Sequence, residues 1–347
     1  MDMRVPLKIA EPLPLLDRQQ RALRELRVSV IDRCNFRCTY CMPADSLQGR
    51  GVFLPLEKLL TDHELETLVR AFALLGVRKL RITGGEPLLR PGLPALIRRL
   101  SSISGLADIA LTTNGVMLPR LAGDLADAGL SRLTVSLDTL DESVLARMSG
   151  GKARLDDILA GIAAAEAAGF VRLKINTVVQ RGVNDHTVME LLDHFRGTPH
   201  RVRLIEYMDV GNTNHWSARD VVPNAEWIET IGQRWPIRPK ASDNPAETAR
   251  RYEYLDGQGE IGFISSISQP FCGGCTRARV TADGVFYTCL FSNHGTNLMP
   301  LIRHGEDPRD LVDRIAEVWA ARADRYSELR GQPGGERQKV EMYRLGG

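Results

Sequence analysis

Short apolar runs rich in β-branched residues recur along the first two-thirds of the chain, and longer, partly polar stretches separate them. Runs of this kind predict strands. The expected strands are residues 26–31, 79–83, 109–112, 133–137, 173–179 and 203–207.

The intervening stretches carry apolar side chains at the 3.6-residue spacing of an amphipathic helix. The first of them has Leu65, Leu68 and Phe72 on one face. An alanine-rich stretch is expected to end its helix at Gly169, which is a favourable C-cap residue. The expected helices are residues 62–75, 93–100, 118–128, 155–168 and 188–195.

The alternation of strands and helices predicts a parallel sheet with right-handed crossovers. There are six such units rather than the eight of a complete TIM barrel. This number favours an α/β fold built as an incomplete (β/α)6 TIM-type barrel. An open, doubly wound sheet is the competing arrangement.

The pattern changes after about residue 223. Asp283-Gly284 is a hairpin turn signal. The elements expected here are a helix at 224–232, a polar connector at 240–249, strands at 260–266, 277–281 and 285–287, and a helix at 309–323. The sequence therefore predicts an N-terminal extension (residues 1–22), the barrel (23–240) and a C-terminal α+β region (241–347).

Composition narrows the class of protein. The 45 basic and 43 acidic side chains nearly balance, so nucleic acid is not an expected partner. Charged residues interrupt the first residues before an apolar run develops, so no signal peptide is expected. No apolar run is long enough to predict a membrane span. The expected location is the cytoplasm, where thiols stay reduced and clustered cysteines indicate metal ligands.

The six cysteines fall into two triplets. Three thiolates can hold three corners of a cubane iron–sulfur cluster and leave the fourth iron open to a small molecule. Two such sites indicate two small molecules, each on its own iron. The triplets are Cys34, Cys38 and Cys41, spaced C-x3-C-x2-C, and Cys272, Cys275 and Cys289, spaced C-x2-C-x13-C.

Spacing alone leaves the metal of the second triplet open. His294 follows Cys289 closely, and three cysteines with one histidine also satisfy a structural zinc site. The first triplet has no histidine nearby, so zinc would lack a fourth ligand there.

Polar residues follow each predicted strand, at the end where (β/α) barrels gather their active sites. The glycines of Gly84-Gly85 are expected to allow positive φ and to let backbone amides approach a ligand. The strand-end groups are the first cysteine triplet, residues 83–87 and 112–115, Ser136 and Asp138, Lys174 and Asn176, and residues 206–208.

Several longer strings together resemble a known family. They are Asp-Arg-Cys-Asn-Phe-Arg-Cys-Thr-Tyr-Cys-Met-Pro at 32–43, Arg-Ile-Thr-Gly-Gly-Glu-Pro-Leu-Leu-Arg at 81–90, Ile-Glu-Tyr-Met-Asp-Val-Gly-Asn-Thr-Asn at 205–214, Phe-Cys-Gly-Gly-Cys-Thr-Arg-Ala-Arg at 271–279, and a C-terminal Gly-Gly. The chain resembles the radical S-adenosylmethionine superfamily and, within it, the GTP 3′,8-cyclases of molybdenum cofactor biosynthesis. The resemblance runs from about Leu26 to Gly347.

The resemblance implies a radical S-adenosylmethionine barrel whose C-terminal region carries a second iron–sulfur site. Each triplet would ligate a [4Fe–4S] cluster, the first binding S-adenosylmethionine and the second the guanine of GTP. It implies cofactor contacts at Tyr40, Gly85, Ser136 and Met208. It implies GTP contacts at Arg27, Arg81, Thr112, Lys174, Arg277, Ala278 and Arg279.

The implied reaction begins with reductive cleavage of S-adenosylmethionine to a 5′-deoxyadenosyl radical. The radical removes the 3′ hydrogen of GTP, and C3′ then bonds to C8 of guanine. The implied catalytic residues are the first triplet with Arg277 and Arg279. The implied partners are GTP, a reduced flavodoxin- or ferredoxin-type electron donor, and the next enzyme of the molybdopterin pathway. A homodimer is among the oligomeric states that the sequence leaves open.

Charge supports a triphosphate ligand. Arg27, Arg81 and Lys174 belong to three separate predicted strands, with Arg172 as a competing cation beside Lys174. Arginine forks suit phosphate oxygens. Two rivals remain at this point, a radical S-adenosylmethionine enzyme acting on a peptide and a structural or redox-sensing metalloprotein. The resemblance implies that the Gly346-Gly347 tail enters the catalytic pocket, and glycines can thread a narrow channel where larger residues would clash.

Overall fold

The structure is a computed structural model that describes residues 14–44, 53–242, 246–305, 307–330 and 339–346. Its strands form one sheet in the order β12-β11-β10-β1-β2-β3-β4-β5-β6-β9-β8-β7. Every neighbouring pair from β10 to β9 is parallel, and antiparallel pairs lie at the two ends. The sheet is therefore a parallel core with an antiparallel flank on each side.

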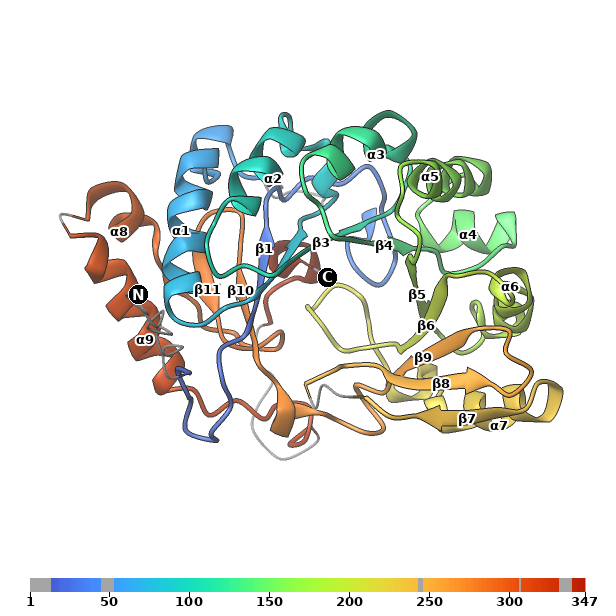
Figure 1. Cartoon of the computed structure of the whole chain (residues 1–347). Coiled ribbons are helices and arrows are strands. Elements are labelled where there is room, and N and C mark those ends of the chain that lie inside the picture. Colours follow the sequence, from blue (N-terminus) through green and yellow to red (C-terminus); the bar gives the residue numbers. More distant parts are fainter. Residues whose placement is uncertain (1–13, 45–52, 243–245, 306, 331–338, 347) are drawn as a thin grey trace, which may run out of the picture.

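The core confirms the six predicted strand–helix units. Figure 1 shows the helices α1 to α6 along the outer side of the curved sheet, as in an incomplete barrel. A doubly wound sheet would need helices on both faces, so that alternative is wrong. The strands are β1 Glu25–Ser29, β2 Lys79–Thr83, β3 Asp108–Thr113, β4 Arg132–Ser136, β5 Lys174–Val179 and β6 Arg201–Glu206.

The outer helices form where the apolar period predicts them, and local caps fix their ends. At the start of the first helix, the Thr61 and Glu64 side chains bond reciprocally to each other's backbone N–H groups. Gly169 follows the fifth helix with φ +92°, in the left-handed region that ends many helices. The helices are α1 Asp62–Leu74, α2 Leu93–Ser101, α3 Leu118–Asp127, α4 Glu142–Met148, α5 Leu155–Ala167 and α6 Val188–Phe195.

The short helix α4 was not predicted from the sequence. It is too short to show a full apolar period, and Asp141 caps it by accepting from the backbone N–H groups of Ser143 and Val144. Single-turn 3₁₀ segments complete the connections. They lie at Leu56–Lys58, Pro87–Leu89, Asp185–Thr187, Ala218–Asp220 and Cys272–Gly274.

The C-terminal region extends the barrel sheet at both edges. β9 lies parallel to β6, and β10 lies parallel to β1 with Arg277 opposite Glu25 and Arg279 opposite Arg27. This arrangement brings Cys272 and Cys275, which precede β10, beside the first strand of the barrel. The strands are β7 Ile237–Lys240, β8 Arg250–Tyr254, β9 Glu260–Ile264, β10 Arg277–Val280, β11 Val285–Tyr287 and β12 Thr296–Asn297.

Strands β7, β8 and β12 were not predicted. The boundary expected between residues 240 and 241 falls between β7 and β8, which pair antiparallel. That division into domains stays a prediction. The remaining helices are α7 Asn224–Arg234, α8 Met299–His304, α9 Pro308–Ala320 and α10 Met342–Leu345.

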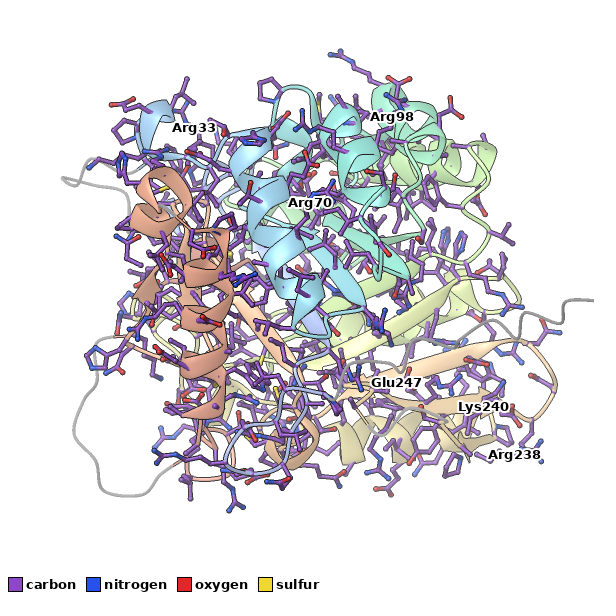
Figure 2. The ribbon with its side chains drawn as sticks, turned by 60° about the vertical axis from the view of Figure 1, so that its left-hand side comes forward. Arg33, Arg70, Arg98, Arg238, Lys240 and Glu247 are labelled. Atoms are coloured by element: carbon purple, nitrogen blue, oxygen red, sulfur yellow. The ribbon has the colours of Figure 1, made fainter. Side chains whose placement is uncertain are left out.

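Charged side chains cover the outside of the molecule. Figure 2 labels Arg70 on α1 and Arg98 on α2, which point outward and are exposed. The edge strand β7 carries Pro239 and pairs Arg238 with Glu253, features that discourage pairing with another strand. Within the described ranges, no helix has the length and apolarity that a membrane crossing requires.

Candidate functional site

One cavity of about 280 Å³ lies at the carboxyl ends of the barrel strands. Side chains from strand ends, from the loops that follow them and from the C-terminal region line it. Both cysteine triplets face it, although more than two hundred residues separate them in the sequence. The cysteines that line it are Cys34, Cys38, Cys41, Cys272, Cys275 and Cys289.

The first triplet lies in the loop after β1. Local hydrogen bonds shape this loop: the Cys41 N–H donates to the Cys38 carbonyl oxygen (3.0 Å), and the Phe36 N–H lies 3.3 Å from Cys34 Sγ. Burial raises the pKa of Cys34 to about 11 and also raises the pKa values of Cys38 and Cys41. These thiols therefore hold their protons until a metal displaces them.

The glycines after β2 serve a purpose different from the one expected. Neither Gly84 nor Gly85 has a positive φ. A Cβ on Gly84 would lie 2.7 Å from the Ile31 carbonyl oxygen, and one on Gly85 would lie 2.8 Å from that of Asp32. The Gly85 N–H donates to the Ile31 carbonyl oxygen (2.7 Å). The glycines thus let the β2 loop pair closely with the cysteine loop.

Two buried carboxyl groups flank the first triplet. Burial raises the pKa of Glu86 to about 7, although it accepts from the Thr113 hydroxyl (2.7 Å) and the Asn114 N–H (2.8 Å). Burial also raises the pKa of Asp138 to about 6, and its carboxylate accepts from the Tyr40 hydroxyl (2.8 Å). This side of the cavity offers negative charge and acceptors suited to an amino group and to hydroxyls.

Arginines lie beside part of the second triplet. Burial raises the pKa of Cys275, but the guanidinium groups of Arg277 and Arg322 outweigh burial and hold it at about 6. Arg277 Nη2 lies 3.3 Å from Cys275 Sγ. Burial raises the pKa of Cys289 to about 11. His294, the fourth ligand of the zinc alternative, is exposed and does not line the cavity. Three thiols face the cavity here, with the Asp324 carboxylate also in its lining, and three thiols fit a cluster with one open iron.

Within the described ranges, no three Cys, His, Asp or Glu side chains converge closely enough to hold a single metal ion.

A group of cations lies beside this second triplet. Arg27, Arg81, Arg277 and Arg279 line the cavity, and Glu25 lies against Arg27 at 3.1 Å and against Arg81 at 3.8 Å. These cations hold the pKa of Glu25 at about 2 although burial opposes it. Burial lowers the pKa of Arg27 to about 10. Several buried guanidinium groups thus share one carboxylate, which favours a polyanionic ligand.

Threonines from neighbouring strands orient Arg81. Its Nη1 donates to the hydroxyls of Thr112 and Thr134 at 3.3 Å each. Its Nε is buried without a hydrogen-bond partner. A buried donor without a partner is costly, so an acceptor is expected at this place when the site is filled.

The predicted cofactor contacts also face the cavity. Tyr40, Gly85, Ser136 and Met208 all line it. Two predicted GTP contacts do not: Lys174 is the first residue of β5, and Ala278 is fully buried in β10. Lys174 occupies the same face of β5 as Asn176, which lines the cavity. Burial and the arginines around Lys174 lower its pKa to about 6.

Three cavity arginines were missed in the sequence. Arg203 on β6 is buried, and its Nε donates to Asn176 Oδ1 (2.9 Å). A cation within an apolar strand, as with Arg27 and Arg81, is the signal that could have found it. Arg21 and Arg322 lie outside the barrel strands, and no local pattern marks them.

The last described residues lie against the loop after β6. The Asn212 side-chain amide donates to the Lys339 carbonyl oxygen (2.6 Å) and accepts from the Lys339 N–H (3.0 Å). Glu341 accepts from the Asn212 N–H (3.1 Å) and the Thr213 hydroxyl (2.9 Å). Lys339 Nζ also pairs with the Asp209 carboxylate (2.8 Å). Backbone and charge contacts together fix where the tail enters the barrel.

Beyond this contact, the tail lies inside the barrel. Figure 1 shows the red C-terminal segment within the curve of the sheet. Arg279 Nη1 donates to the carbonyl oxygens of Leu345 (3.2 Å) and Gly346 (2.5 Å). Gly346 has φ +70°, and a Cβ there would overlap the Thr83 hydroxyl. Gly347 lies outside the described residues.

Comparison with known families divides the chain much as the fold does. The Radical SAM superfamily profile matches residues 28–195, which run from the end of β1 through α6. The profile described as Molybdenum Cofactor Synthesis C matches residues 200–328, which contain the second cysteine triplet.

Several curated relatives match nearly the full length. A GTP 3′,8-cyclase of Xanthomonas campestris pv. campestris is 52% identical over 96% of this chain and 98% of its own. One of Acidothermus cellulolyticus is 50% identical over 91% of this chain and 89% of its own. One of Staphylococcus saprophyticus is 42% identical over 96% of this chain and 99% of its own.

Solved structures share the fold at low identity. Streptococcus suis SuiB bound to S-adenosylmethionine has a TM-score of 0.59 and 16% identity, and covers 86% of this chain and 69% of SuiB. Native anSMEcpe with bound AdoMet has a TM-score of 0.57 and 14% identity, and the match covers 92% of this chain and 87% of that one. These likenesses concern the fold alone.

Proposed function

The chain belongs to the GTP 3′,8-cyclase family of radical S-adenosylmethionine enzymes, and on that premise we propose which of its residues carry the reaction. It is an enzyme that converts GTP to (8S)-3′,8-cyclo-7,8-dihydroguanosine 5′-triphosphate, the first step of molybdenum cofactor biosynthesis. A [4Fe–4S] cluster with S-adenosylmethionine supplies its radical chemistry. The residue assignments below are proposals.

One observation carries the proposal: a single cavity holds two cysteine triplets, the first beside the carboxyl groups of Glu86 and Asp138 and the second beside Arg277 and Arg322. Cys34, Cys38 and Cys41 would hold the cluster that binds S-adenosylmethionine. The carboxylates of Glu86 and Asp138 lie on that side and suit the amino and hydroxyl groups of this ligand. Tyr40, which donates to Asp138, would keep that carboxylate oriented.

The other side would bind GTP. We propose that Cys272, Cys275 and Cys289 hold a second [4Fe–4S] cluster and that the adjacent arginines bind the triphosphate. Arg27, Arg81 and Arg203 come from three strands and point into one space, so they can grip phosphate oxygens from several directions. Fixed cations of this kind would hold C3′ and C8 in a reactive geometry.

Metal content tests the second cluster. Anaerobically purified protein is expected to contain roughly eight irons and eight sulfides per chain, because two cubanes require that number. Iron, acid-labile sulfide and zinc would be measured on the same sample. Stoichiometric zinc beside about four irons would refute the second cluster and return the site to the Cys289 and His294 alternative.

Binding measurements test the triphosphate site. Arg81→Met should weaken GTP binding by about 2–5 kcal/mol, the penalty typical of losing a desolvated charge partner. The loss should be smaller for guanosine, which has no phosphates. Anaerobic calorimetry with both ligands measures the difference.

Arg132→Met is the matched control for Arg81→Met. Arg132 lies on β4, pairs with Asp108 and does not line the cavity. This control should bind GTP like the parent protein. If Arg81→Met and Arg132→Met discriminate GTP from guanosine equally well, Arg81 is not a phosphate ligand.

The remaining assignments follow from the reaction. Reductive cleavage needs a low-potential electron, so we propose a reduced flavodoxin- or ferredoxin-type donor. The product is the substrate of the next enzyme in the molybdopterin pathway, which would take it up. Exposed iron clusters and free thiols are best preserved in a reducing compartment, so we propose a cytoplasmic location.

A further inference from the structure

Three side chains form a buried charged group behind the second cysteine triplet. Asp17, Arg21 and Arg322 are 3%, 3% and 4% exposed. Asp17 Oδ2 lies 2.7 Å from Arg21 Nε and 3.0 Å from Arg322 Nη1, so one carboxylate joins the two guanidinium groups. Asp17 and Arg21 precede β1, while Arg322 follows α9. Segments from distant parts of the sequence therefore meet at this point.

The group holds the cysteine segment by its backbone. Arg21 Nη1 donates to the carbonyl oxygens of Cys272 (2.9 Å) and Asp324 (2.8 Å). Arg322 Nη1 donates to the carbonyl oxygen of Cys275 (2.8 Å). Two of the three cysteines are thus fixed by arginines from distant parts of the sequence, and a change in either arginine would release a ligand-bearing turn.

Arg21 also keeps one donor without a partner. Its Nη2 is buried and makes no hydrogen bond. Arg322 Nε makes no hydrogen bond either, but it lies 3.4 Å from Asp324 Oδ2. Both residues line the cavity together with the three cysteines of the second triplet. Because a buried N–H without an acceptor is costly, the free Nη2 of Arg21 indicates an acceptor that arrives with the ligand of this site.

The charge beside the thiols also favours an anionic ligand. The guanidinium groups of Arg21 and Arg322 are matched by Asp17 and by Asp324, which lies 3.4 Å from Arg322 Nε. Arg277, whose Nη2 lies 3.3 Å from Cys275 Sγ, adds positive charge beside the thiols. A [4Fe–4S] cluster held by three thiolates carries net negative charge, and its sulfurs accept hydrogen bonds.

We propose that Arg21, supported by Asp17 and Arg322, is a positioning residue of the second cluster, which fixes the Cys272 turn and donates its free N–H to the cluster or its thiolates. The inference rests on the second cluster of the proposed function. Positive charge and hydrogen bonds next to a cluster stabilise its reduced form, so Arg21 would raise the reduction potential.

The experiment isolates the second cluster. Cys34, Cys38 and Cys41 are all replaced by alanine, and the full-length protein is reconstituted anaerobically with iron and sulfide. In this background we compare Arg21→Met, Arg21→Lys and the control Arg18→Met. Arg18 lies in the same segment but is exposed, and it does not line the cavity. Redox titration followed by electron paramagnetic resonance gives the potential, and loss of iron to a chelator gives the cluster's stability.

Arg21→Met should shift the potential to a more negative value and lose iron several-fold faster than Arg18→Met. Arg21→Lys keeps the charge, but its three N–H groups cannot serve Asp17, both carbonyl oxygens and the cluster together, so both changes should be smaller but measurable. If Arg21→Met does not fold, Arg21→Lys alone decides. Potentials and iron loss equal to those of Arg18→Met in every folded Arg21 variant would overturn the inference.

A background that binds no iron would instead refute the second cluster itself, and the inference with it. That outcome can be told apart from failure of the inference, in which iron is present and the Arg21 variants behave like the control.

Discussion

Cys38→Ser should abolish cleavage of S-adenosylmethionine, whereas Cys275→Ser should abolish the cyclised nucleotide and leave some uncoupled cleavage. The reason is the separation of the two triplets within one cavity. Cys38 lies on the side of Asp138 and Glu86, while Cys275 lies on the side of Arg277 and Arg322. Each substitution therefore removes one thiolate from one side of the cavity and leaves the other side intact.

Two products measure the split. Chromatography of anaerobic reactions quantifies 5′-deoxyadenosine, which reports cleavage, and the cyclised nucleotide, which reports coupling. Iron content must show that each variant still carries the cluster of its unaltered triplet. Equal loss of 5′-deoxyadenosine in both variants, with the unaltered cluster present, would show that the two triplets do not divide the work in this way.

The barrel could be predicted because the sequence signals of its strands and helices are local. Each strand of the core is an apolar run, and each outer helix except α4 shows its own apolar period, so a window of sequence contains the signal. The sequence also predicted that the segments with candidate site residues lie together, because parallel strands place their carboxyl ends at one rim of the barrel. This is why Cys34, Gly85 and Ser136 could be assigned to one site before their positions were known.

The flanking strands β7 and β8 were not predicted, for identifiable reasons. β7 contains Pro239, which argues against a strand, and an edge position tolerates it. β8 reads Arg-Arg-Tyr-Glu-Tyr, and its alternating buried tyrosines, Tyr252 and Tyr254, were hidden among charges. Such strands are defined by their neighbours in the sheet, and a single window of sequence does not contain those neighbours.

Long-range electrostatics was the least predictable part. Asp17 pairs with Arg322, which lies near the other end of the sequence. Neither residue belongs to one of the sequence strings by which the chain resembles its family. Residues on β6 and β10 show the same limit of prediction. Arg203 faces the cavity while Ala278 faces away from it, although both lie in strands that mix arginines with apolar residues. Only the three-dimensional sheet shows which side chains share a space.

Gly346→Ala should reduce GTP cyclisation by about 10²-fold, the loss typical of a reacting group displaced by roughly an ångström. Gly346 has φ +70°, and a Cβ there would overlap the Thr83 hydroxyl and lie 2.8 Å from Thr83 Cβ. The tail would have to leave the position in which Arg279 binds its carbonyl oxygens. Cyclised nucleotide per turnover of S-adenosylmethionine is the measurement.

Gly92→Ala is the control for an alanine placed at a positive φ. Gly92 has φ +73° and ψ 13°, in the left-handed region, and a Cβ there meets no atom within 4 Å. Gly346 has φ +70° but ψ 103°, so the alanine at 346 carries a larger backbone strain as well as the clash with Thr83. Gly92→Ala should cyclise GTP at the parental rate, and both variants should keep full iron content. A Gly346→Ala enzyme that matches Gly92→Ala in cyclisation would show that the tail has no part in the reaction and is an ordinary chain end.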